Sequence, residues 1–212
     1  MKNIRLAGFD FDGTLLDSAD RFYNASSEIF RRHNKTPPSR EYYVANFGSP
    51  MDAYYKGLGL DISVTEIVVA YKQLLNGFIP AFFPDSIEVL NKWSSRCYLA
   101  IVSSNNQERI YSSLSSHKCD KMCNQIISTE DKRTAIRRLS KITTGLKTNS
   151  FYVGDMAEDM MAASAANVIA VGITRGHNTG DILKRAGADI VIDKLDELEP
   201  ALEKYQANLI VA

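Results

Sequence analysis

An acidic pair directly after an apolar segment constrains this chain more than any other feature. Residues 7–9 begin as an apolar strand, and Asp10 and Asp12 follow it. Because alternate residues of a strand point to the same side, both carboxylates face one place while Phe11 points into the core. Gly13 then allows a sharp turn and brings backbone N–H groups close to a ligand.

Two carboxylates so close together repel each other, so this repulsion must be offset by other features of the site. A bound cation compensates, and so does a division of roles between a nucleophile and a proton donor and acceptor. The alternative is a solvated turn, since Asp and Gly are common turn residues. The preceding strand and a second acidic motif, at Asp155 and Asp159, favour the chemical interpretation.

The composition is ordinary for a globular protein. The chain has 212 residues, 45% of them hydrophobic and 24% charged, with a formal net charge of zero. This balance argues against nucleic acid or an anionic membrane as the main partner. Residues 1–5 contain no secretory apolar segment, and no apolar run is long enough to span a bilayer. We expect a cytoplasmic protein that is a monomer or a homodimer.

The cysteines suggest a reducing compartment. Cys97, Cys119 and Cys123 are too few, and odd in number, for a disulfide framework. With His117 the last two suggest a zinc site as an alternative. A structural zinc site requires four ligands and usually has a tighter CxxC spacing. We therefore expect a loop with a buried Cys123.

Helical periodicity dominates residues 18–80. The expected helices run from an N-cap at Ser18 to about residue 33, from a cap at Ser39 to about residue 47, and over residues 51–58 and 64–79. The short apolar run at residues 67–69 is the one strand candidate in this block.

Strands and helices alternate from residue 84 onward. Asp85 is expected to cap a helix that runs through residue 93. The expected strands are residues 97–102, 125–128, 150–153, 168–171 and 190–192, and the expected helices are residues 107–115, 132–142, 156–166, 182–185 and 195–205. This alternation predicts an α/β fold, a Rossmann-like parallel sheet with helices on both faces. The helical block is then an insertion between the first two strands.

Ligands bind beyond the carboxyl ends of the strands in an open parallel sheet. Besides the two acidic motifs, Ser103 and Lys132 are expected at that edge, and these residue types suit phosphate and metal chemistry. Taken alone, Ser103 is also explained as a helix cap and Lys132 as part of a solvated helix face. A lysine in the first turn of a helix is mildly unfavourable, because its positive charge lies at the positive end of the helix dipole. A carboxylate or phosphate that faces the lysine would offset this cost.

The segment Asp10-Phe11-Asp12-Gly13-Thr14-Leu15 resembles the first motif of the haloacid dehalogenase (HAD) superfamily in its phosphatase form. The strand that ends in Ser103 resembles the second motif, and Lys132 resembles the third. Gly154-Asp155 with Asp159 resembles the fourth motif, GDxxxD. The four motifs occur in the family's order over nearly the whole chain, and the chain is most similar to phosphoglycolate-phosphatase-like members. In relatives proline often follows the lysine, whereas here Arg133 follows and is the alternative for its role.

The resemblance implies a Mg²⁺-dependent phosphatase acting on a small phosphorylated metabolite, with phosphoglycolate as one candidate. Asp10 would attack phosphorus, and Asp12 would protonate the leaving oxygen and then activate water. The implied metal site consists of Asp10, the Asp12 carbonyl, Asp155 and Asp159. The implied phosphate site consists of Gly13, Ser103, Ser104 and Lys132.

The resemblance also divides the chain into two domains. Residues 1–16 and 81–212 would form the core, and residues 17–80 a small α-helical cap that closes over the site. Arg21 and residues 46–50 would face the substrate, with Asn46 and Gly48 as binding candidates. Glu158 is expected to face solvent. His177 is expected to be a surface-loop residue, with contact to the substrate as the alternative.

Two alternatives to a phosphatase remain at this stage. A phosphomutase of the β-phosphoglucomutase type would use the same residues and return the phosphoryl group to its substrate. A non-enzymatic phosphate-binding or regulatory protein on the same fold would need none of the catalytic side chains. The second aspartate of the first motif, Asp12, argues against dehalogenase and phosphonatase relatives, which carry another residue there.

Overall fold

The computed structural model describes residues 4–48, 50–142 and 146–211. They include a six-stranded sheet in which every pair of neighbouring strands is parallel. The strand order is β3-β2-β1-β4-β5-β6. The strands are β1 (Leu6–Phe9), β2 (Tyr98–Ser103), β3 (Gln125–Ser128), β4 (Ser150–Gly154), β5 (Ile169–Ile173) and β6 (Ile190–Ile192). The order reverses at β1, so the loops after β1 and β4 open at the switch point where such sheets bind ligands.

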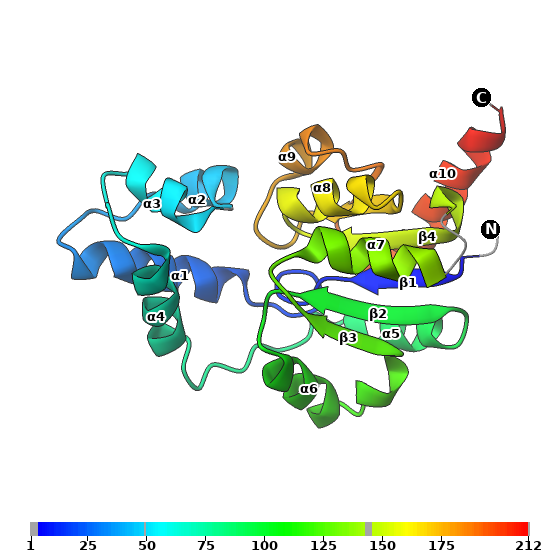
Figure 1. Cartoon of the computed structure of the whole chain (residues 1–212), viewed down its shortest axis with the longest axis horizontal. Helices are drawn as coiled ribbons and strands as arrows, with labels where there is room; N and C mark the ends of the chain where they lie inside the picture. The colour runs from blue at the N-terminus through cyan, green and yellow to red at the C-terminus, as the bar shows by residue number, and fades with distance from the viewer. Residues whose placement is uncertain (1–3, 49, 143–145, 212) are drawn as a thin grey trace.

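Helices cover both faces of the sheet, as predicted, and Figure 1 shows this layered arrangement. One face packs against α5 (Ser86–Ser94), α6 (Gln107–Ser116) and α10 (Leu198–Val211). The other face packs against α7 (Lys132–Ile142), α8 (Ala157–Ala165) and α9 (Gly180–Arg185). The predicted α/β fold class is therefore confirmed. Short 3₁₀ turns complete the chain at η1 (Asp120–Met122), η2 (Lys147–Asn149) and η3 (Leu195–Glu197).

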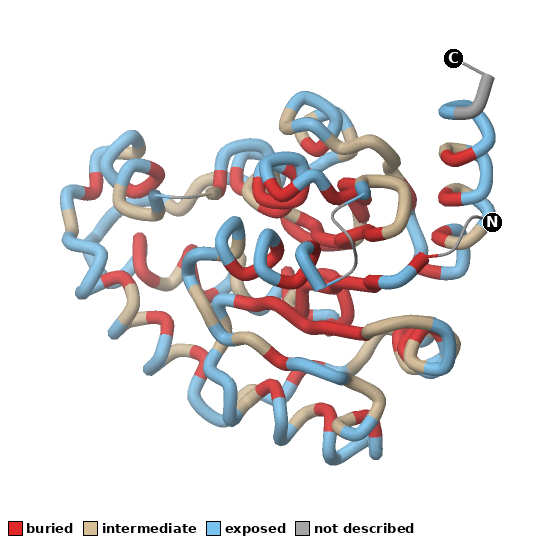
Figure 2. Tube along the Cα trace, turned by 45° about the vertical axis from the view of Figure 1, so that its right-hand side comes forward, coloured by how far each residue is buried: buried red, intermediate tan, exposed pale blue. Residues whose placement is uncertain are grey.

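Alternation of side chains along the strands divides the core into two clusters. In β4, Phe151 and Val153 point to the first face, and Tyr152 points to the second. Trp93 of α5 meets the Phe151 ring at a centroid distance of 4.8 Å. Because both faces are covered, the central strands are buried along their length, as Figure 2 shows.

Of the five described helices between β1 and β2 in the chain, the first four extend from one end of the sheet (Figure 1). They are α1 (Ala19–Arg32), α2 (Arg40–Asn46), α3 (Met51–Gly57) and α4 (Val64–Leu74). The described part of residues 18–80 contains no strand, and the apolar run at residues 67–69 lies within α4. Ile67 is buried there and Val69 is 47% exposed, as helical spacing requires.

The four helices enclose a hydrophobic cluster separate from the two sheet clusters, with members such as Phe30, Tyr43 and Tyr55. The segments that lead into and out of this helical block lie next to each other, because Asp17 N donates to Ala81 O at 2.9 Å. The separate cluster supports a division at residues 16/17 and 80/81, which stays a prediction.

Several predicted helix ends differ from the structure for local reasons. The helix predicted to reach residue 79 ends at Leu74, because Gly77 adopts a left-handed φ of +73°. Ser39 caps α2 through Tyr42 N as predicted. Ser18 and Asp85 precede α1 and α5 but make no side-chain cap. Ser18 Oγ accepts instead from Gly13 N in the preceding loop, and Asp85 pairs with the distant Arg175.

Among the described residues, no helix combines the length and the apolar character needed to cross a membrane.

Candidate active site

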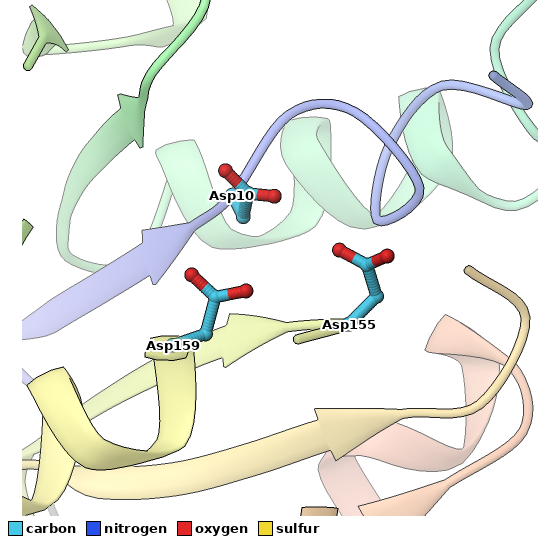
Figure 3. Close-up of side chains that lie close together, drawn as sticks. All are labelled: Asp10, Asp155 and Asp159. Carbon is cyan, nitrogen blue, oxygen red and sulfur yellow. The ribbon is translucent and has the colours of Figure 1, made fainter. Parts of the chain in front are cut away.

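Three carboxylates gather at the carboxyl ends of the central strands. Asp10 follows β1, Asp155 follows β4, and Asp159 lies in the first turn of α8. All three residues are buried. One oxygen from each lies within 4.8 Å of the others, and Figure 3 shows the three side chains close together. Such a cluster needs positive charge nearby, because the carboxylates repel one another in a buried setting.

Lys132 supplies part of that charge from the start of α7. Its Nζ lies 2.8 Å from Asp10 Oδ1 and 2.7 Å from Asp159 Oδ1, and only 14% of its side chain is exposed. Burial alone lowers the pKa of Lys132, but Asp10 and Asp159 outweigh burial and raise that pKa well above its usual range. The amine is therefore charged and faces the cluster. Arg133, the alternative, is exposed.

The cluster fits a divalent cation. With all three carboxylates ionised and Lys132 charged, three negative charges and one positive leave a net charge of −2. Carboxylate oxygens are the ligands that Mg²⁺ prefers. Burial raises the pKa of Asp10 although Lys132 opposes the rise, and a bound cation would favour the ionised form. Thr14 Oγ1 makes a long contact of 3.4 Å with Asp155 Oδ1.

Gly13 lets the loop after β1 approach this cluster. Its φ is +72°, in the left-handed region that glycine adopts without strain. A Cβ at this position would lie 2.3 Å from Asp155 Oδ2. The Gly13 N–H donates to Ser18 Oγ at 3.1 Å, which explains why Ser18 makes no side-chain cap to α1.

His177 belongs to the site, and its prediction as a surface-loop residue was wrong. It is 5% exposed, and both its backbone N and its ring Nδ1 contact Asp155 Oδ2, at 2.7 and 2.8 Å. Burial would raise the pKa of Asp155, but the hydrogen bonds from His177 lower it. The imidazole also packs against the rings of Phe22 and Phe47 at centroid distances of 5.7 and 6.0 Å. The neighbouring glycine, Gly176, was a signal for close packing in the sequence.

Asp12 lies beside the cluster but takes no part in it. Asn105 Nδ2 donates to Asp12 Oδ2 at 2.6 Å. Asp12 Oδ1 is buried and has no hydrogen-bond partner among the described residues. Burial raises the pKa of Asp12 from its ordinary value, although the Asn105 hydrogen bond opposes this. A raised pKa favours the protonated carboxyl, which a proton donor needs.

A cavity of about 590 Å³ lies over these residues. Asp10, Asp12 and Lys132 line it, and so do Ser103 and Ser104 at the end of β2. Ser103 is 3% exposed, and its Oγ accepts from Asn105 N at 3.1 Å. The structure thus brings all four predicted motifs to the same end of the sheet.

The residues predicted to face the substrate from the helical insertion divide into two groups. Gly48 and Phe47 line the cavity. Asn46 does not line it, and its Nδ2 donates to Tyr42 O at 2.8 Å. Arg21 is also outside the lining and donates to Leu74 O at 2.8 Å. Ser49, within the predicted 46–50 loop, lies outside the described residues.

Glu158 lines the cavity, so the expectation that it faces solvent was wrong. It lies next to the 47–48 loop, where a Cβ on Gly48 would lie 2.9 Å from Glu158 Oε1. The GDxxxD spacing places Glu158 one residue before Asp159, on a different side of α8. Only the approach of the helical insertion makes that side part of the cavity.

The cysteines lie away from this site. Cys119 is buried and its Sγ donates to His117 O at 3.3 Å. Cys123, predicted to be buried, is half-buried, and burial raises the pKa of its thiol to about 12. Among the described residues the acidic cluster is the group arranged to hold a metal ion.

Arg175, which the sequence did not single out, holds the active-site loop in place. Its guanidinium contacts both carboxylate oxygens of Asp85, at 2.6 and 2.8 Å, and donates to Thr14 O at 2.6 Å. It also lies over the Phe83 ring at 4.0 Å. Asp85 therefore pairs with Arg175, and it also accepts from Leu195 N rather than capping α5.

Arg175→Met is expected to lower the free energy of unfolding by about 3 kcal/mol, because it leaves the largely buried Asp85 carboxylate without its cation. Urea unfolding followed by circular dichroism measures the change. Arg185→Met, at an exposed position of α9, is the matched control and should change stability little. An unchanged unfolding midpoint in Arg175→Met would contradict the anchoring role.

The family model for haloacid dehalogenase-like hydrolases matches residues 8–173. The match spans most of the chain and includes all four motifs. The chain belongs to the haloacid dehalogenase-like hydrolase family, and the predicted superfamily is confirmed.

Curated relatives are named phosphoglycolate phosphatase. The protein from Pseudomonas fluorescens is 26% identical over an alignment of 216 positions, gaps included, and the alignment covers 92% of this chain and 79% of that protein. The protein from Salmonella typhi is 39% identical over 51 residues, which cover 24% of this chain and only 20% of that protein. These names support the predicted enzyme class, a phosphoric monoester hydrolase.

Solved structures share the fold. A haloacid dehalogenase-like family hydrolase from Streptococcus pneumoniae matches with a TM-score of 0.75 at 21% identity, covering 93% of this chain and 98% of that chain. A Bacteroides vulgatus structure assigned as a β-phosphoglucomutase matches with a TM-score of 0.71 at 16% identity, covering 97% of this chain and 90% of that chain. At these identities the likeness shows the fold alone.

Proposed function

We propose that this protein is a Mg²⁺-dependent phosphatase that hydrolyses a small phosphomonoester through an aspartyl-phosphate on Asp10. The observation that carries the proposal is that Asp10, Asp12, Ser103 and Lys132 line one cavity, and that Asp10 also belongs to the buried cluster of three carboxylates. Cytoplasmic location and a monomeric or homodimeric state remain predictions.

Asp10 and Asp12 divide the chemistry. In the first step the Asp10 carboxylate attacks phosphorus, the ester P–O bond breaks, and Asp12 gives its proton to the leaving oxygen. In the second step Asp12 takes a proton from a water that attacks phosphorus, and the bond to Asp10 breaks to release phosphate. The raised pKa of Asp12 suits the proton donor of the first step.

The other residues position the phosphoryl group and balance its charge. Ser103 Oγ and the Ser104 backbone N–H would donate to phosphoryl oxygens, and Lys132 would offset their charge. Asp10, the Asp12 carbonyl and Asp155 would hold Mg²⁺, with Asp159 in support. The ion would supply positive charge that offsets repulsion between Asp10 and the anionic phosphate. His177 keeps Asp155 oriented toward the cluster through its two hydrogen bonds.

Phosphate release from a panel of phosphomonoesters, with Mg²⁺ and with EDTA, tests the proposal. The panel includes phosphoglycolate, sugar phosphates and nucleoside monophosphates. Release that requires Mg²⁺ is the expected result. Phosphate release that is slow unless a sugar phosphate is present would favour the phosphomutase alternative. No release from any ester would favour a non-enzymatic binding protein.

Mg²⁺ is also expected to stabilise the folded protein, because it binds a cluster that the unfolded chain lacks. At a hundredfold excess over its dissociation constant, a ligand specific for the folded state adds about 2.7 kcal/mol. Thermal unfolding with Mg²⁺ and with EDTA measures the effect without any substrate. Asp155→Asn should remove most of the Mg²⁺-dependent shift, whereas Asp181→Asn, at an exposed position of α9, should retain it. An equal shift in both variants would place the ion elsewhere.

A further inference from the structure

The cavity has two chemically different sides. The sheet side carries the reactive side chains described above. The side formed by the helical insertion is mainly apolar. Its apolar lining residues come from α1, from α4 and the residue after it, and from the residues around the start of α3: Phe22, Phe47, Met51, Val68, Tyr71 and Leu75. A phosphate held on the sheet side would direct the rest of the substrate toward this apolar side.

Two methionines of the core continue the apolar surface. Met156 and Met161 line the cavity near α8, and Met161 is 48% exposed. Unbranched, polarisable methionine side chains adapt to the shape of an aromatic or aliphatic ligand. The apolar surface therefore borders the space beyond the phosphate from both the insertion and the core.

Away from the reactive side chains, acids and bases in the lining are equal in number. Lys72, Arg109 and Arg133 are balanced by three acids, Glu130, Asp131 and Glu158. The Arg109 guanidinium already donates to Phe78 O at 3.1 Å. The carboxylate of a two-carbon substrate such as phosphoglycolate would thus meet as many acids as bases.

The size of the cavity also favours a substrate larger than phosphoglycolate. At about 590 Å³ it falls within the range of pockets that enclose ligands of drug size. A phosphate with a two-carbon acid would leave most of this space to water against apolar side chains. A phosphate ester whose alcohol carries a ring would cover those side chains and gain the free energy of their burial.

We propose that the substrate of this site is a phosphomonoester whose leaving alcohol carries an apolar ring, and that Val68 of α4 contacts this ring. The inference rests on the proposed phosphatase function and specifies its substrate class.

A matched pair of substrates tests the inference. Ethyl phosphate and 2-phenylethyl phosphate have alkyl leaving groups of similar reactivity and differ by the ring. We expect kcat/KM for the phenylethyl ester to exceed that for the ethyl ester about tenfold or more, because the ring is transferred from water to an apolar surface. Phosphoglycolate, as a third substrate, should be turned over less efficiently than the phenylethyl ester.

Neighbouring valines of α4 provide matched variants. Val68 lines the cavity, whereas Val69 is 47% exposed and does not. Val68→Asp is expected to reduce the phenylethyl-to-ethyl ratio of kcat/KM about fivefold or more, since a carboxylate disfavours an apolar ring. Val69→Asp should leave the ratio unchanged. Circular dichroism checks that both variants are folded.

The outcomes separate this inference from the proposed function. A ratio near one in the unaltered protein, or more efficient turnover of phosphoglycolate, would overturn the inference and leave the phosphatase function in place. If Val68→Asp and Val69→Asp changed the phenylethyl-to-ethyl ratio equally, the proposed contact between Val68 and the ring would be wrong. If none of the esters released phosphate in a metal-dependent way, both proposals would be overturned together.

Discussion

Asp10→Asn is expected to reduce kcat for phosphate release by about 10⁴-fold or more while the protein folds normally. An amide does not attack phosphorus as a carboxylate does, so the covalent step is lost. The fold should persist because the substitution removes one charge from a buried cluster of like charges. Single-turnover and steady-state phosphate release measure the loss, and circular dichroism checks the fold.

Asp17→Asn is the matched control for this experiment. Asp17 lies in the same loop, seven residues further along, but it is exposed and lies outside the cavity lining. Its substitution should leave kcat within about twofold of the unaltered protein, in line with the small effects of surface changes. If Asp10→Asn retained the wild-type rate, the nucleophile assignment would be wrong.

Lys132→Met is expected to lower both activity and stability. Turnover should fall about 10³-fold, because the phosphoryl group loses a cation in a buried site. The free energy of unfolding should fall by about 3 kcal/mol near neutral pH, because Asp10 and Asp159 lose their ion-pair partner. Methionine has a similar length, so loss of packing contributes little.

The stability loss in Lys132→Met should depend on pH with a definite sign. Without the lysine, the pKa values of Asp10 and Asp159, already raised by burial, rise further in the folded state. The folded protein then binds more protons than the unfolded chain, so the variant regains stability as the pH falls toward these raised values. Urea unfolding at several pH values measures this trend.

Two other basic residues of α7 complete the design. Arg137→Met, at an exposed position of the same helix, should leave both turnover and stability nearly unchanged. Arg133→Met tests the alternative assignment of the lysine role. If Arg133→Met abolished turnover and Lys132→Met did not, the phosphate-neutralising role would belong to Arg133.

Local pattern was sufficient to predict the elements of the fold. Near-continuous apolar runs marked strands that are buried on both faces, such as residues 97–102, and helical spacing marked the insertion. Helix ends were less predictable. The signal of Gly77 was local and was overlooked. The Ser18 side chain accepts from Gly13 N in the same loop, whereas Asp85 pairs with Arg175, which no local pattern specifies.

The motifs near strand ends were likewise readable in the sequence. Asp10 and Asp155 follow apolar strands directly, and parallel strands present their carboxyl ends at one edge, so a common location followed from pattern alone. His177, Glu158 and Arg175 were misjudged or missed. Each lies in a loop or on a helix face whose surroundings come from segments distant in sequence.

The sequence by itself determined the α/β class, the four motifs and their order, and the chemistry that those residue types allow. Tertiary structure alone decided the strand order with β1 next to β4, the contact of Lys132 with both Asp10 and Asp159, and the burial of His177. The physical reason is that periodicity and turn chemistry act between near neighbours, whereas charge pairing and burial depend on which distant segments pack together.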